Sequence, residues 1–269
     1  MIRPTPDEAL PQERQPWIVD RLRSHGRVVT LELAGLFRVS EDSVRRDLRE
    51  LAAQGLCKRV YGGALPLSAA STPLKQRRTE AGGRKQALAR RAVSLVRRGQ
   101  VLLIDAGSTN AAIAAALPEN FGLTVVTNAP DIARILIDRE GFEILLIGGR
   151  IDPRVGAAIG AQAIQDIARV RADLCFPGAC AIDATHGLWS FDSEESLLKR
   201  AMIEASGETV VAVTDEKLGT AATHRVAPIS DVQHLVVEHD VGRATRSAFT
   251  AKGVVVHRAD AVAGDRSRG

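Results

Sequence analysis

The stretch Ser40-Glu41-Asp42-Ser43-Val44-Arg45-Arg46-Asp47-Leu48 predicts a short helix with two chemically different faces. At about 100° per residue, the apolar residues gather on one side and the arginines on the other. The apolar face holds Val44, Leu48 and Leu51, and the opposite face holds Arg45, Arg46 and Arg49. Ser40 is a favourable N-cap, and the two acidic residues that follow it suit the positive end of the helix dipole. One face is therefore expected to pack and the other to meet an acidic partner.

Two further helices are expected upstream of this one. Residues 16–25 carry an apolar stripe that ends at Gly26, and Leu31 to Phe37 form a second short helix after a β-branched stretch. Arg38 and Val39 then form the turn before Ser40. This order of helix, helix, turn and helix predicts a helix-turn-helix arrangement.

A basic hairpin is expected next. Residues 56–61 include Lys58 and Arg59 and are followed by Gly62 and Gly63, a pattern that suits a wing lying along a phosphate backbone. A lone Arg-rich helix is usually just a solvated face, but the ordered set of elements favours DNA binding. The candidate DNA contacts are Ser40, Ser43, Arg45, Arg46, Arg49, Lys58 and Arg59.

The charge distribution supports this interpretation. Residues 1–98 contain 20 Lys and Arg against 10 Asp and Glu, and residues 99–269 contain 16 against 22, so the two parts carry +10 and −6. A basic segment binds a polyphosphate with release of counterions, whereas an acidic one is repelled. Only the N-terminal part is expected to contact DNA; the alternative is that its basic excess serves solubility.

Length and composition suit two domains. The 269 residues are 45% hydrophobic but only 3% aromatic, which disfavours base stacking on aromatic platforms and favours a double-stranded DNA partner. Cys57, Cys175 and Cys180 form neither a disulfide framework nor a zinc pattern, so buried free thiols are expected. No membrane-spanning run and no signal sequence are recognisable, which predicts a cytoplasmic protein with no membrane partner.

The segment between the domains has two possible roles. Residues 66–73 are rich in Pro, Ser and Ala and suggest a linker, and residues 75–98 carry nine basic residues with Glu80 as the one acid. A structural connector helix over 86–96 is the preferred interpretation, and an auxiliary contact to the DNA backbone is the other. The expected division is a winged helix-turn-helix domain over 13–66, a linker and connector helix over 67–98, an α/β domain over 99–258, and a disordered tail over 259–269.

The α/β domain is predicted from alternating strands and helices. Apolar, strand-like segments lie at 101–105, 123–127, 143–147, 172–176, 209–215 and 234–237, and helical patterns lie at 111–117, 131–139, 161–170 and 194–206. Such alternation favours a parallel sheet covered by helices on both faces. Ligands of such sheets bind at the carboxyl ends of the strands, so the loops there are the candidate site.

The first of these loops is Asp105-Ala106-Gly107-Ser108-Thr109-Asn110. A glycine, two hydroxyls and a helix N-terminus suit a bound phosphate, although ordinary helix capping explains the same residues. The glycine spacing matches neither a P-loop nor a dinucleotide fingerprint, and no cofactor or metal is predicted. Polar residues at other strand ends are expected to converge here. The candidate effector-binding residues are Asp105, Gly107, Ser108, Thr109, Asn110, Thr127, Asn128, Gly148, Gly149, Arg150, Gly178, Asp183, Lys199, Asp215 and Lys217.

Several of these motifs occur in the same order in one family. The helix that begins at Ser40, the segment Val60-Tyr61-Gly62-Gly63-Ala64, and the later segments 105–109, 126–128, 148–149, 195–202 and 215–219 resemble those of DeoR-type (DeoR/GlpR-like) bacterial transcriptional regulators over residues 14–237. The resemblance implies a sugar-isomerase-like α/β fold in the C-terminal domain, a phosphorylated sugar or related metabolite as effector, and assembly into a homodimer or homotetramer.

The predicted function is a DNA-binding transcriptional regulator, a repressor, whose affinity for its operator is controlled by a phosphorylated metabolite. Two alternatives are kept. The first is a sugar-phosphate isomerase fused to a DNA-binding head, with Asp183 or Glu195 as a base beside Lys217. The second is a DNA-binding protein that responds to no ligand.

Overall fold

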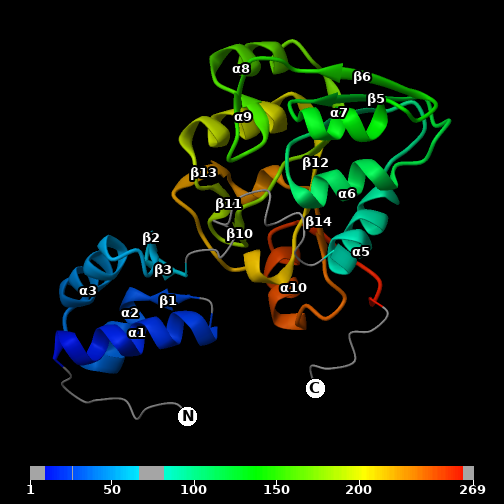
Figure 1. The fold of residues 1–269 in the computed structure, drawn as a ribbon. Coiled ribbons are helices and arrows are strands. Elements are labelled where there is room, and N and C mark those ends of the chain that lie inside the picture. Colours follow the sequence, from blue (N-terminus) through cyan, green and yellow to red (C-terminus); the bar gives the residue numbers. More distant parts are fainter. Residues whose placement is uncertain (1–9, 26, 67–81, 263–269) are drawn as a thin grey trace.

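The N-terminal head is a three-helix unit with a small antiparallel sheet (Figure 1). The computed structural model describes residues 10–25, 27–66 and 82–262. The elements of the head are α1 (Pro11–His25), β1 (Val28–Val29), α2 (Thr30–Phe37), α3 (Glu41–Ala53), β2 (Lys58–Val60) and β3 (Gly63–Leu65). Its three strands lie in the order β1-β3-β2, with β3 in the centre. The head is thus a winged helix-turn-helix, as predicted, although α1 begins before residue 16.

The head has a compact apolar core beneath α3. Val44, Leu48 and Leu51 are each at most 2% exposed, so the amphipathic pattern packs as its periodicity predicts. Trp17 of α1 meets Phe37 of α2 edge to face, with ring centroids 5.3 Å apart. These contacts fix the position of α3 against the first two helices.

The larger domain contains a seven-stranded sheet in which every neighbouring pair is parallel. The strand order is β15-β14-β12-β9-β4-β5-β6. The strands are β4 (Val101–Ile104), β5 (Leu123–Thr127), β6 (Phe142–Leu146), β9 (Ala172–Phe176), β12 (Ser206–Ala212), β14 (His234–Val237) and β15 (Val255–Arg258). The helices are α5 (Gly82–Val93), α6 (Ser108–Ala116), α7 (Pro130–Leu136), α8 (Ala161–Ile167), α9 (Ser193–Glu204) and α10 (Arg243–Thr250). The predicted parallel α/β architecture is confirmed.

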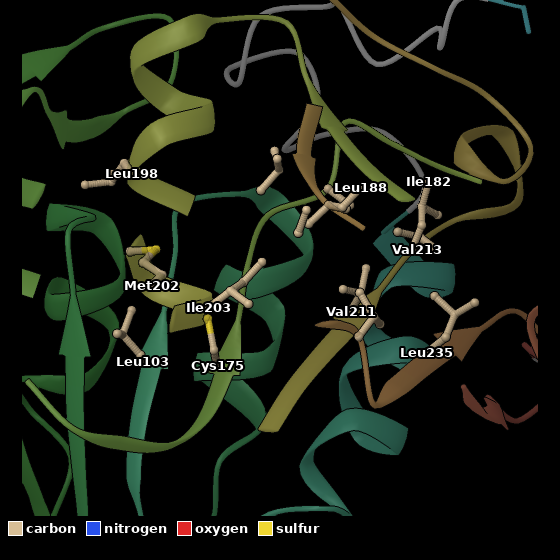
Figure 2. Packing of buried hydrophobic residues seen from close by; sticks show 14 of the residues in the cluster. Leu103, Cys175, Ile182, Leu188, Leu198, Met202, Ile203, Val211, Val213 and Leu235 are labelled. Atoms are coloured by element: carbon tan, nitrogen blue, oxygen red, sulfur yellow. The ribbon is translucent and has the colours of Figure 1, made fainter. Parts of the chain in front are cut away.

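Helices cover both faces of this sheet. Leu103, Cys175 and Val211, on three neighbouring strands, pack in one core with α8, α9 and α10 (Figure 2). The residues that flank them in the strands pack in a second core, against α5, α6 and α7. Successive side chains of a strand point to opposite faces, so a strand buried on both sides must be apolar throughout. This explains the uninterrupted apolar runs in the sequence.

Two small sheets complete the domain. A hairpin pairs β7 (Arg150–Asp152) with β8 (Ala157–Ile159), and β10 (Ala181–Asp183), β11 (Gly187–Ser190) and β13 (His224–Ala227) form an antiparallel sheet. Two short 3-10 helices, η2 (Asp215–Lys217) and η3 (Ile229–Asp231), lie in the adjoining loops. The sequence patterns predict none of these small strands, because three or four residues are too few for a clear period. The strand predicted over 209–215 also ends earlier, at Ala212, because η2 begins at Asp215.

The segments that flank the α/β domain pack against it. The predicted connector helix is α5, whose Leu88 is fully buried in the second core. At the other end, the Ala259 amide donates to Val237 O and its side chain is 5% exposed, so the predicted tail starts within packed structure. Most of the predicted linker, residues 67–81, and the end of the predicted tail, residues 263–269, lie outside the described residues. The predicted domain limits otherwise stay predictions.

Candidate functional site

The outward face of α3 carries the arginines that the sequence selects, but their environments differ. Arg45 is bound by two carboxylates of its own helix, at 2.6 Å from Glu41 and 2.9 Å from Asp42. Arg46 and Arg49 are exposed. Arg45 must therefore exchange these partners before it binds a phosphate, whereas Arg46 and Arg49 face solvent.

Ser40 and Ser43 act together at the start of α3. Ser40 Oγ accepts a hydrogen bond from the Ser43 amide at 3.2 Å, and the two hydroxyls lie 3.0 Å apart. This is N-cap geometry, which satisfies one of the free amides of the first turn. Both serines therefore cap the helix, and this structural role is additional to the DNA contact predicted for them.

The opposite face of α3 holds a buried ion pair that the sequence pattern does not reveal. Arg14 Nε of α1 lies 2.7 Å from Asp47 Oδ2, and the two side chains are 7% and 2% exposed. Asp47 is the neighbour of the exposed Arg46 in α3. The ion pair that holds Asp47 inward therefore also holds Arg46 outward. The sequence signal for this ion pair is a charged residue at the edge of the apolar stripe, because a charge that becomes buried there needs a partner.

The wing places its basic residues on its outer strand. Lys58 is half-buried and Arg59 is exposed, both on β2. Tyr61, at the turn between β2 and β3, is fully exposed and was not among the predicted contacts. A fully exposed aromatic side chain with a hydroxyl at the wing tip can donate to a phosphate oxygen. The sequence signal for the exposure of Tyr61 is its position before Gly62 and Gly63, which favours a turn.

A pocket lies where the strand order of the large sheet reverses. From β4 the chain proceeds to β5 and β6 on one side, then crosses to β9, β12, β14 and β15 on the other. Such a switch point leaves a crevice at the carboxyl ends of the two central strands. The pocket is lined by Ala106, Gly107, Ser108, Thr109, Asn110, Val155, Gly178, Ala179, Cys180, Glu195, Lys199, Ala212 and Lys217.

The wall of this pocket contains a buried cluster of three charges. Lys199 Nζ contacts Asp105 Oδ2, and it lies 2.9 Å from Glu195 Oε1. Lys199 and Asp105 are each 1% exposed, and Glu195 also accepts from Ser190 Oγ at 2.7 Å. Burial by itself lowers the pKa of Lys199, but the two carboxylates more than offset it and raise that pKa above its usual value. Lys199 therefore keeps its positive charge at neutral pH.

Groups suited to an anion lie beside this cluster. The first turn of α6 begins after Gly107, whose φ of 146° favours glycine, and the amides of such a turn have no partner within the helix. Lys217 Nζ, which donates to Ala179 O at 2.8 Å, lines the same pocket. A helix N-terminus and an ammonium group together suit a phosphate, and the carboxylates of the buried cluster suit hydroxyl donors. The pocket thus has complementary groups for a phosphorylated polyol.

Gly178 is required by close packing at this point. Its amide donates to Asp105 Oδ2 at 2.8 Å, and an added Cβ would lie 2.6 Å from Ala106 O and 3.0 Å from Lys199 Nζ. No side chain fits there without displacement of the backbone. Gly178 therefore holds the loop after β9 against the loop after β4.

The structure brings half of the predicted effector residues to the pocket. Gly107, Ser108, Thr109, Asn110, Gly178, Lys199 and Lys217 line it, and Asp105 lies directly behind Lys199. The Asn110 amide nitrogen donates to Asp105 O and Phe176 O, both at 2.8 Å, so it joins the ends of β4 and β9. Its side chain thereby shapes the pocket wall.

Seven predicted effector residues lie outside the pocket lining, as a correction to the expected convergence: Thr127, Asn128, Gly148, Gly149, Arg150, Asp183 and Asp215. Thr127 Oγ1 donates to Ile104 O, Asn128 donates to Ala158 O, and Arg150 pairs with Glu194. Thr127 and Asn128 lie at the end of β5, and Gly148 to Arg150 follow β6. Both strands lie on the side of β4 that is away from β9. Asp215 is the first residue of η2, and burial raises its pKa above the usual value, with help from Asp240 and Glu216.

The carboxylate of Asp183 makes its hydrogen bonds within a turn of the chain. Its Oδ1 accepts from the Thr185 and His186 amides, both at 2.9 Å, and from His186 Nδ1 at 2.7 Å, within the turn of the β10–β11 hairpin. These bonds outweigh the effect of burial and lower the pKa of Asp183. Of the two bases that the isomerase alternative names beside Lys217, Glu195 lines the pocket and Asp183 does not. Glu195 is the one charged lining residue outside the predicted effector contacts, although it stands within a motif of the resemblance. The other lining residues outside that set are Ala106, Val155, Ala179, Cys180 and Ala212.

Comparison with known proteins agrees with this division into two parts. Residues 14–69 match the DeoR-like helix-turn-helix domain, and residues 80–239 match the DeoR C terminal sensor domain. The chain belongs to the DeoR family. It is 37% identical over 221 residues to the glycerol-3-phosphate regulon repressor of Escherichia coli K12, which covers 82% of this chain and 88% of that protein. It is also 32% identical to the HTH-type transcriptional regulator GlpR of Haloferax volcanii, over 92% of this chain and 97% of that protein.

This DeoR-family chain is a DNA-binding transcriptional regulator and not an enzyme, as the sequence predicts. Among solved structures, a ribose 5-phosphate isomerase from Methanocaldococcus jannaschii is similar at 17% identity and a TM-score of 0.36, over 51% of this chain and 54% of that one. Within the described residues, no helix is both long and apolar enough to cross a bilayer. In the same part of the chain, no group of three or more His, Cys, Asp or Glu side chains is placed to hold a metal ion.

Proposed function

We propose that this DeoR-family protein is a repressor whose affinity for its operator is set by a phosphorylated polyol or sugar in the switch-point pocket. The observation that carries the proposal is the convergence of Lys217, the N-terminus of α6 and the buried cluster of Asp105, Lys199 and Glu195 on one crevice. The phosphate would bind Lys217 and the α6 amides, and the hydroxyls would face the carboxylates. Relatives named as glycerol-3-phosphate regulon repressors support a phosphorylated polyol as the class of ligand.

On the DNA side, α3 enters the major groove of a double-stranded operator and the wing contacts the backbone. Arg46 and Arg49 are the side chains free to reach bases or phosphates, and Lys58, Arg59 and Tyr61 extend the contact along the wing. An operator read by two recognition helices requires them about one DNA turn apart, which is why a homodimer or homotetramer is proposed. A regulator of this kind acts where the chromosome is, which places it in the cytoplasm.

Control requires the effector to bind two arrangements of the protein unequally, because equal affinity shifts no population. The two arrangements would differ in the orientation of the heads, so that one of them mismatches the spacing of the half-sites. Effector and operator then change each other's affinity by the same factor.

The test is a binding experiment on the full chain with three probes: glycerol 3-phosphate, glycerol and inorganic phosphate. The proposal expects glycerol 3-phosphate to raise the melting temperature and to change the affinity for a DNA duplex that the protein selects from a random pool. Lys217→Ala should abolish both effects of the probe, and Lys252→Ala, an exposed lysine outside the pocket lining, is the matched control. If neither glycerol 3-phosphate nor any of a panel of sugar phosphates changes stability or DNA affinity, the proposed effector class is wrong.

A further inference from the structure

The wing of the head is docked on the α/β domain through one small apolar cluster, which we call the seam. It consists of Leu65, Cys180, Ala181, Trp189, Ala221 and Ala222, with Val60 and Phe191 at its rim. Leu65 is 1% exposed, although it lies at the end of a wing strand. Figure 1 shows β2 and β3 on the side of the head that faces β10 and β11. The seam therefore joins the DNA-binding unit directly to the sensor domain.

The central strand of the wing has one side in each domain. Ala64 packs in the core of the head and Leu65 packs in the seam, as the alternation of a strand requires. The Ala221 amide also donates to Pro66 O at 3.1 Å, so the backbone after β3 is bound to the sensor domain as well. A displacement of the seam must therefore move β3, and with it the wing.

Four of the residues that share the seam with Leu65 belong to two segments that also line the pocket. In the first, Ala179 and Cys180 line the pocket, and Cys180 and Ala181 form the seam. In the second, Lys217 lines the pocket, and Ala221 and Ala222 form the seam only a few residues later.

These two segments are bonded to each other between the pocket and the seam. Lys217 Nζ donates to Ala179 O at 2.8 Å, and the Gly219 amide donates to Ile182 O at 2.8 Å. A ligand anion that draws Lys217 toward itself competes with its bond to Ala179 O. The bond to Ala179 O is thus one connection between the pocket and the seam.

The seam also contains a buried hydrogen-bond donor, the indole of Trp189. Trp189 is 8% exposed, and within the described residues its indole Nε1 is one of three buried side-chain polar atoms without a hydrogen-bond partner. A buried donor without an acceptor destabilises the arrangement that contains it. A second arrangement in which this donor finds an acceptor would therefore be favoured at this point.

We propose that Leu65, buried in the seam together with Cys180 and Trp189, is the positioning residue through which occupancy of the pocket sets the orientation of the wing. The proposal rests on the proposed function, because it concerns the same pocket. Leu65 contacts neither the effector nor DNA; it transmits the difference between the two arrangements. Coupling of this kind is measured by the ratio of DNA affinities with and without effector.

The experiment compares Leu65→Ala with Leu136→Ala, a buried leucine of α7 that lines neither the pocket nor the seam. For each full-length protein, calorimetry measures the affinity for glycerol 3-phosphate, and fluorescence anisotropy measures the affinity for the selected duplex at zero and saturating probe. Leu65→Ala should keep each separate affinity within about threefold and bring the ratio of DNA affinities close to one. Leu136→Ala should keep the wild-type ratio, which typically lies between about 5 and 150. A wild-type ratio in Leu65→Ala overturns the proposal.

Trp189 provides a second readout that needs no effector. The chain has two tryptophans, so Trp17→Phe leaves Trp189 as the one indole. Saturation of this variant with the duplex should shift the emission of Trp189, because the wing must reorient on DNA. The same duplex should cause no shift when Leu65→Ala is added. If no probe binds, the proposed effector class is wrong, but the emission of Trp189 still tests the role of the seam. Unchanged Trp189 emission on DNA binding by itself overturns the proposal that the seam sets the orientation of the wing.

Discussion

The two parts of the molecule use charge in opposite ways. In the head, Arg46 and Arg49, the proposed DNA contacts, lie exposed on α3. In the sensor domain, Asp105 and Lys199 are each 1% exposed, and Lys199 binds both Asp105 and Glu195. A polyanion as large as DNA must be met by charges at the surface, where counterion release favours binding. A small ligand must be discriminated by charges already desolvated and fixed. Removal of a charge should therefore affect binding in the head and folding in the sensor domain.

The largest expected effect is on the buried cluster. Lys199→Met leaves Asp105 and Glu195 buried without their cation, and we expect a loss of about 3–5 kcal/mol in the free energy of unfolding. Urea denaturation of the full chain measures it. Arg200→Met, the next residue of α9, breaks exposed pairs with Glu204 and Asp231 and should cost less than about 1 kcal/mol. Equal losses in the two variants would remove the distinction between the parts.

Asp47→Ala tests the exception within the head, because Asp47 is the buried carboxylate of α3. The substitution removes the partner at 2.7 Å from Arg14 Nε, and we expect a loss of about 3 kcal/mol in the stability of the head. Asp42→Ala, on the same helix but exposed, should cost less than about 1 kcal/mol. Near-UV circular dichroism against urea, measured with Trp189→Phe in every protein so that Trp17 is the one indole, reports the head. Similar midpoints for both variants would contradict the role assigned to the buried pair.

Arg46→Ala should change binding and leave folding alone. We expect weaker binding of the selected duplex and a fall of about one in the slope of log affinity against log salt, if Arg46 meets a phosphate, or a relaxed sequence preference, if it meets a base. The free energy of unfolding should stay within about 0.5 kcal/mol of wild type. Arg169→Ala removes an exposed arginine of the sensor domain and is the control. A matching loss of DNA affinity in the control would contradict the assignment of DNA binding to the head.

The smallest effect concerns pH and the sensor domain alone. Burial, Arg91 and His234 lower the pKa of His257 below its usual value. Because the folded state resists this protonation more than the unfolded chain does, the contribution of His257 to stability is complete above about pH 6.5 and decreases as the pH falls below it. His257→Gln should reduce the loss of stability between pH 7 and pH 5, by less than about 1 kcal/mol because the ring is partly solvated. An unchanged pH profile would show that His257 titrates as it does in the unfolded chain.

The sequence predicts the head in more detail than the pocket. The periodicity around Val44, Leu48 and Leu51 places α3 and its exposed arginines correctly, because a helix face depends on residues close in sequence. The loop at 105–110 was also predicted at the pocket. Thr127, Asn128 and Gly148 to Arg150 were expected there and lie elsewhere, since their distance from Asp105 depends on the order of strands in the sheet. No local pattern determines that order.

The sequence by itself determined the two-domain architecture, the recognition helix and the family, because helix period, charge distribution and ordered motifs are properties of neighbouring residues. Only the tertiary structure decided which side chains share the pocket, that Arg14 and Asp47 meet beneath α3, and that Leu65 of the wing lies in one apolar cluster with Cys180 and Trp189. These contacts join residues from 33 to more than 90 positions apart in the chain. Such pairs come together through packing of the whole sheet and its helices, and packing depends on shape and burial in three dimensions.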